Sequence, residues 1–210
     1  MYVNLTSCVR AAVAAGAFLA VVGASSMASA VGFSGSYQVN AHNSGPGLLI
    51  QTQELADPLN FALANPGDFY TVDLFKIWTE ETDVEWGEDT LPRSISVDFD
   101  FTAPPSSGSV LGTTLGGSII ITEWGSVTWA GPEVIDFGNG GKLRITLSDE
   151  TFNKGLFGLK HGRDHGAIVE AKFKLISDSV AEVPLPASLP LLMAALGGLA
   201  VLRRRTGAAT

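Results

Sequence analysis

The sequence predicts an all-β fold, an antiparallel β-sandwich of jelly-roll-like type between two apolar terminal segments. Three observations lead to this class. Apolar and polar residues alternate along two segments, turn residues recur at intervals of roughly ten residues, and the middle of the chain lacks the periodicity of an amphipathic helix. The 210 residues include 24 Gly and 10 Pro, which is enough punctuation for many short strands joined by tight turns.

The clearest strands are the two segments in which the alternation is regular. Residues 93–102 place one set of side chains on the apolar face: Ile95, Val97, Phe99 and Phe101. The polar face of the same segment holds Ser94, Ser96, Asp98 and Asp100. Residues 167–176 repeat this pattern with alternating apolar and charged residues. Each segment is therefore expected to form a strand with one buried face.

The first half of the chain holds four further candidate strands, at residues 35–39, 48–53, 59–63 and 69–79. The last of these is apolar on both faces, so it is expected to lie centrally in its sheet, with Trp78 in the core.

The second half is expected to contain two hairpins and one helical turn. The first hairpin joins 117–123 to 125–129, with its turn at Trp124 and Gly125. The second joins 133–137 to 142–148 through the Gly-rich residues 136–141. Residues 151–159 are the one stretch assigned a helical turn.

The N-terminus has the features of a secretory signal peptide. Arg10 precedes an apolar segment over residues 11–22, and Ala28-Ser29-Ala30 has the small-residue form of a signal-peptidase site. Cleavage is expected after Ala30, which makes the protein an exported one. The only cysteine, Cys8, would be removed with this peptide, so the mature chain has no disulfide and no thiolate metal site.

The C-terminus reads as a weak membrane anchor. Residues 189–202 carry no charged side chain, but 14 residues rise only about 21 Å as a helix, whereas a hydrocarbon core is about 30 Å thick. The basic residues that follow, Arg203, Arg204 and Arg205, favour a cytoplasmic end by the positive-inside rule. A transient association with the inner membrane is expected.

Just before this segment lies a short motif made of Val183, Pro184, Leu185, Pro186 and Ala187. Motif, apolar helix and basic stop together resemble the PEP-CTERM class of bacterial sorting signals in its VPLPA-type variant. The resemblance implies a Gram-negative source, removal of the tail by an exosortase, and a final place at the cell surface or in an exopolysaccharide or biofilm matrix. The alternative is an ordinary C-terminal anchor that follows a Pro-containing linker.

These features divide the chain into four parts: a signal peptide at 1–30, a β-sandwich domain at 31–177, a linker with the motif at 178–188, and the sorting helix with its basic stop at 189–205. After removal of both ends, nine Lys and Arg stand against 21 Asp and Glu, a net charge of −12. This balance argues against a nucleic-acid partner and against binding to an anionic membrane.

Two clusters of side chains are candidates for a metal site, although no resident metal is predicted. Glu80, Glu81 and Asp83 begin an acidic run that could supply oxygen ligands to calcium; the alternative is a solvated loop. His161 and His165 are four residues apart, which on a helix would place both on one face and suit zinc. Flanking glycines favour a polar turn before the last strand instead.

The remaining candidates concern carbohydrate. Asp98 and Asp100 share a strand face, as a glycosidase pair would, yet a solvent-facing strand requires the same alternation. Trp86 and Trp124 stand beside glycines and are the tryptophans expected at the surface, where they could stack on sugar rings.

Known catalytic motifs, namely the nucleophile elbow, the phosphate loop and the H-E-x-x-H zinc motif, do not occur. We therefore expect a non-enzymatic envelope or matrix protein without cofactors, whose partners are signal peptidase, exosortase and exopolysaccharide. A secreted carbohydrate- or calcium-binding module and a secreted hydrolase are the alternatives.

Overall fold

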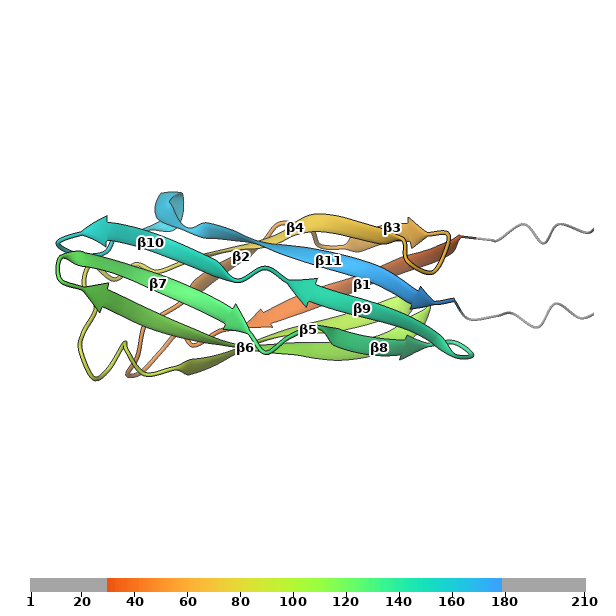
Figure 1. Cartoon of the computed structure of the whole chain (residues 1–210), viewed down its shortest axis with the longest axis horizontal. Coiled ribbons are helices and arrows are strands. Elements are labelled where there is room, and N and C mark those ends of the chain that lie inside the picture. Colours follow the sequence, from red (N-terminus) through yellow and green to blue (C-terminus); the bar gives the residue numbers. More distant parts are fainter. Residues whose placement is uncertain (1–29, 179–210) are drawn as a thin grey trace, which may run out of the picture.

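The computed structural model describes residues 30–178, and over this range the chain forms eleven β-strands and one short 3-10 turn (Figure 1). The strands make two curled antiparallel sheets, so the all-β prediction is confirmed. The predicted helices of the signal peptide and of the tail, with Ala28, the motif from Val183 onward and the three terminal arginines, lie outside the described residues.

The larger sheet has six strands in the order β10-β7-β6-β5-β1-β3. Their bounds are β1 Val31–Asn40, β3 Leu59–Leu63, β5 Arg93–Ala103, β6 Pro105–Ile119, β7 Thr122–Trp129 and β10 Glu150–Leu156. The smaller sheet has five strands in the order β2-β4-β11-β9-β8. Their bounds are β2 Gln51–Glu54, β4 Phe69–Trp78, β8 Glu133–Phe137, β9 Gly141–Leu147 and β11 Ala167–Ser177. The 3-10 turn η1 spans Arg163–His165.

The alternating segment 93–102 forms a strand, β5, with one buried face, as predicted. β5 pairs with β1 on one side and with β6 on the other, and its apolar side chains point into the space between the sheets. Val97 is fully buried, and Phe99 and Phe101 are 2% exposed. The polar side chains of the same strand cover the outer face, so a single period-two pattern builds both the core and the surface.

Aromatic rings form the centre of the core and join the two sheets. Phe173 of β11 lies edge-on to Phe99 and Phe101 of β5, with ring centroids 5.7 and 6.3 Å apart. Phe61 of β3 stacks on Phe173 at 4.8 Å. Each such pair contributes about 0.5–1.5 kcal/mol beyond the apolar area that it buries.

Strand β4 shows why its segment is apolar on both faces. Leu74 and Phe75 are adjacent and both fully buried, which a regular strand with one face towards solvent does not permit. The register against β11 shifts at this point, because Val169 pairs with Phe75 while Glu170 pairs with Asp73. Leu74 is therefore the extra residue of a β-bulge. β4 has neighbours on both sides, as predicted, but Trp78 is only half-buried, so its placement in the core was wrong.

The predicted turn at Trp124 was also wrong. β6 and β7 pair without interruption from Gly112 opposite Trp129 to Ile119 opposite Thr122, so the turn consists of Ile120 and Ile121. Trp124 lies within β7, and a Cβ added to the opposite residue, Gly117, would lie 2.5 Å from its ring. Gly125, which was read as a turn residue, likewise makes room for an aromatic ring, because a Cβ there would overlap the ring of Phe152.

Residues 151–159 were wrongly assigned a helical turn, because most of them form β10. Thr151 and Phe152 pair with β7, and a register shift follows between Phe152 and Gly155. That irregularity buries two consecutive side chains, Phe152 and Asn153, which breaks the period of two. The helical turn occurs instead at η1.

Both ends of the sandwich lie at the same end of the molecule (Figure 1). Val31, at the start of β1, is paired with Leu63, the last residue of β3. Leu175, near the end of β11, forms backbone hydrogen bonds with Gly67 and Asp68 in the loop that follows β3. The longest strand, β6, has 15 residues and spans about 50 Å. We call the opposite end, made by the loops 41–50, 79–92, 120–121 and 157–166, the distal end.

Candidate functional site

The distal end gathers most of the side chains that the sequence singled out. Residues 80–89, which we call the acidic loop, and residues 41–50 enclose a hollow of about 330 Å³. Asp89 is only 4% exposed, and its carboxylate accepts a hydrogen bond from the Glu85 amide at 2.8 Å. Its carbonyl accepts another from the Gly116 amide of β6 at 2.8 Å. Asp89 therefore ties the acidic loop to the larger sheet.

Glu81 faces the same hollow and is partly buried. Burial, as the largest cause, raises the pKa of its carboxyl, and the negative charges of Asp89 and Glu85 raise it further. A hydrogen bond from the Leu49 amide to Oε1 at 3.0 Å acts in the opposite direction. Bringing these carboxylates together is therefore unfavourable when all are ionised.

The three residues named as calcium candidates have separate hydrogen-bond partners. Glu80 accepts from the indole N–H of Trp78 at 2.7 Å, and Asp83 accepts from the Thr82 hydroxyl at 2.9 Å. Glu81 is bonded to the Leu49 amide, as described above. Within residues 30–178, no three acidic, histidine or cysteine side chains are arranged around a point that a metal ion would occupy.

The two histidines lie in a polar turn, as the flanking glycines predicted. His165 ends η1 and its amide bonds to the Gly162 carbonyl at 3.2 Å, while the Gly162 amide bonds to Thr79 at 2.8 Å. Both imidazoles are exposed to solvent. The arrangement differs from the helix on which a four-residue spacing would bring the two rings to one face.

Asn153 is the residue at this end that sequence reasoning missed. Its side chain is fully buried, and its Oδ1 accepts from the Thr79 amide at 3.0 Å. Its Nδ2 donates to the carbonyls of Gly162, at 3.0 Å, and Lys160. Asn153 has a φ of 53°, a left-handed conformation that Asn tolerates better than most residues. It thereby fastens the loop 157–162 to the end of β4.

The outer face of the larger sheet carries the candidate carboxylate pair. Asp98 accepts hydrogen bonds from Ser109 at 2.5 Å and from Asn40 at 2.7 Å, so it is held by both neighbouring strands. Asp100 is in register with Ser36 and with Ser107. These residues form a polar ladder across β1, β5 and β6, and Asp98 acts in it as a hydrogen-bond acceptor.

Three of the four tryptophans reach the surface, and one of them, Trp78, is half-buried with its indole N–H held by Glu80. Trp86 in the acidic loop is 77% exposed, as expected. Trp124 is half-buried and lies on the outer face of β7 over Gly117, so it is a surface residue of a strand and not of a loop tip. Trp129 is 7% exposed and donates its indole N–H to the Ser148 carbonyl at 3.0 Å.

Five exposed apolar side chains on two neighbouring turns of the distal end form a feature that we call the apolar tip, made of Ile119, Ile120, Ile121, Leu156 and Phe157. Ile120 is 96% exposed and Phe157 81%. The Phe157 amide bonds to the Ile121 carbonyl at 2.7 Å, which joins the two turns. Alternation patterns cannot find such a tip, because they assume that an apolar run is buried.

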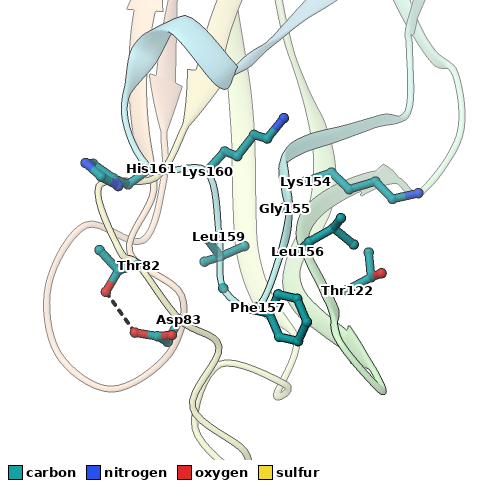
Figure 2. Close-up of a pocket in the computed structure, with 11 residues that line it drawn as sticks. Thr82, Asp83, Thr122, Lys154, Gly155, Leu156, Phe157, Leu159, Lys160 and His161 are labelled. Carbon is teal, nitrogen blue, oxygen red and sulfur yellow. Dashed lines mark hydrogen bonds between the residues drawn. The ribbon is translucent and has the colours of Figure 1, made fainter.

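A second hollow of about 530 Å³ lies beside the tip. Figure 2 shows Thr82 and Asp83 on one side of it and Leu156 and Phe157 on the other, with Leu159 between them. This hollow combines apolar walls with a few charged groups, a composition that is typical of binding surfaces.

Within residues 30–178, no helix has the length and apolar character needed to cross a bilayer. Three comparisons with known proteins, against family models, curated proteins and solved structures, found no match to this chain.

Proposed function

We propose that this chain is an exported, non-enzymatic protein of a bacterial envelope or extracellular matrix, sorted through its VPLPA-type tail. The observation that best supports the proposal is that residues 31 and 177 lie at the same end of the sandwich. A chain held by its tail would present the distal end away from the membrane. The loops and surfaces described above would then face the matrix or a neighbouring cell.

The test is intact mass and cell fractionation of the protein in its host, with and without the exosortase. We expect a mature species that begins near Val31 and lacks the residues from Leu189 onward. Deleting the exosortase should leave the tail in place and the protein in the inner membrane. A species that keeps Arg203 to Arg205 in both strains would refute sorting and leave an ordinary anchored domain.

The motif itself is tested by a matched pair of variants. Pro186→Ala changes the second proline of the motif, whereas Ser188→Ala changes a residue just beyond the motif. We expect the first variant to accumulate unprocessed chain and the second to be processed like the wild type. Equal processing of both would show that the motif is not what the enzyme reads.

A second candidate function is carbohydrate binding at the outer face of the larger sheet. Alternation along β6 places Gly117, and therefore the overlying Trp124, on the same face as Ser109 and the ladder around Asp98. Ser109 and Gly117 are eight positions apart in β6, a separation of about 26 Å, which suits an extended polysaccharide that stacks at one point and hydrogen-bonds at others. The jelly-roll-like type of the predicted β-sandwich stays a prediction.

A glycan array with Trp124→Ala beside Trp86→Ala tests this candidate. Loss of binding with Trp124→Ala alone would locate the ligand on the sheet face. Loss with Trp86→Ala alone would move the site to the acidic loop, and a wild type without any glycan signal would remove the candidate. Repeating the array with and without calcium tests whether the acidic hollow contributes.

A further inference from the structure

The apolar tip contains two residues in an unfavourable backbone conformation. Ile120 has a φ of 57° and Phe157 a φ of 59°, the left-handed region that hairpin turns normally fill with Gly, Asn or Asp. A β-branched residue is especially unfavourable there. Because Ile120 is 96% exposed, its side chain contributes almost nothing to the core. Neither local conformation nor the packing of this chain explains an isoleucine at the position.

The rest of the tip extends the same surface. Ile119 is 63% exposed, Leu156 67% and Ile121 44%. With Ile120 and Phe157 these residues make an apolar patch on the order of 500 Å². That is near the upper limit for a typical monomer and is characteristic of surfaces that another molecule covers.

The shape of the distal end favours a second copy of this chain as the covering molecule. The projecting tip and the hollow beside it lie on one surface and share Leu156 and Phe157. A surface that carries both a projection and a matching hollow can pair with itself about a twofold axis, because each copy then fills the hollow of the other. The apolar floor of the hollow, with Leu159 at its centre (Figure 2), suits an incoming Ile120.

The charges around the hollow are consistent with the same partner. Lys154 and Lys160 line it together with Asp83, and the acidic loop continues beyond Asp83. A twofold contact repeats each pairing twice, so Lys154 or Lys160 of one copy can pair with Asp83 of the other, and the reverse. An anionic lipid surface suits this end less well, because it offers no lysine to Asp83 and repels the carboxylates of the acidic loop.

We propose that two copies of this chain associate tip to tip, with Ile120 and Phe157 of each copy entering the hollow of the other. The association needs only the described domain. If the chain is also held by its tail, a point that rests on the function proposed above, the free distal ends let copies on facing surfaces meet.

The test is sedimentation velocity over a range of concentrations on the protein purified from its host, with its intact mass recorded. Ile120→Asn and Phe157→Asn remove the apolar groups and suit a left-handed backbone. Leu111→Asn is the matched control, because Leu111 is 60% exposed on the outer face of β6, away from the tip. We expect the wild type and Leu111→Asn to dimerise, and both tip variants to associate at least tenfold more weakly.

The melting temperatures make the result decisive. Because the tip substitutions relieve backbone strain, we expect those variants to melt at or above the wild-type temperature at concentrations where the wild type is monomeric, so that weaker association cannot be ascribed to unfolding. A wild type that stays monomeric at every concentration would overturn the proposal, as would tip variants that dimerise normally. A monomeric wild type that floats with phosphatidylcholine–phosphatidylglycerol vesicles through Ile120 would identify a lipid surface instead. Sorting is judged by the mass alone, so the two proposals can fail separately.

Discussion

Replacing Asn153 tests whether one buried side chain holds the distal loops in place. In Asn153→Ala, the Thr79 amide loses the acceptor at 3.0 Å, and the Gly162 carbonyl loses its donor at 3.0 Å. A buried donor left without a partner costs about 1–3 kcal/mol, and each further lost hydrogen bond about 1 kcal/mol. Alanine at a φ of 53° adds about 1 kcal/mol of backbone strain. The expected loss is about 3–5 kcal/mol in the free energy of unfolding.

The assay is urea unfolding of the purified protein, followed by hydrogen exchange of the loop that Asn153 holds. Asn153→Gly keeps the backbone conformation but loses the hydrogen bonds of the side chain. Its loss in the free energy of unfolding should therefore be smaller than that of Asn153→Ala by about 1 kcal/mol, the backbone strain of alanine at this φ. Asn60→Ala, at an exposed position of β3, is the control and should change stability by less than about 0.5 kcal/mol. A loss below about 1 kcal/mol in Asn153→Ala would refute the reasoning and show that water replaces the side chain.

Three further substitutions test other parts of the structure. Because the folded-state pKa of Glu81 is raised above the ordinary value of 4.5, its contribution to stability is complete below that value and is lost as the pH rises through the folded-state pKa. Glu81→Gln should therefore melt higher than the wild type at pH 7, with the difference vanishing under acid; a constant difference would exclude titration as the cause. Tyr37→Phe removes a buried hydroxyl that bonds to the Leu74 carbonyl and the Leu55 amide, and should cost about 1–2 kcal/mol in chemical unfolding; an unchanged midpoint would contradict those bonds. Gly117→Val places a side chain where the Trp124 ring lies, so tryptophan fluorescence should shift to the red as the ring is displaced, whereas an unchanged spectrum would show that the ring does not rest there.

Most of the strands could be predicted because each depends on a local pattern. The alternation in 93–102 and 167–176 predicted β5 and β11 almost to their ends, and residues 59–63 coincide with β3. Gly and Asn between 137 and 141 located the hairpin of β8 and β9. In each case the residues that decide the structure lie next to one another in the chain, so their spacing carries the information.

The sequence-based predictions were wrong where a residue contacts a partner that is distant in the chain. Trp124 and Gly125 read as a turn because the pairing of Trp124 with Gly117 and of Gly125 with Phe152 is set by strand register. Asn153 read as an ordinary polar residue because its partner Thr79 lies 74 positions away. No local pattern records such a contact.

Composition and periodicity were thus sufficient to identify a β-sandwich, since burying one face of a strand requires alternation that is visible in the chain. They also support the export and sorting signals as predictions, because targeting machinery reads short linear segments. The placement of both sandwich ends together, the burial of Asn153 and the exposure of Ile120 at the opposite end followed only from the folded chain. These properties depend on which strands pair and in what register, and pairing energies are shared between segments that the sequence keeps far apart.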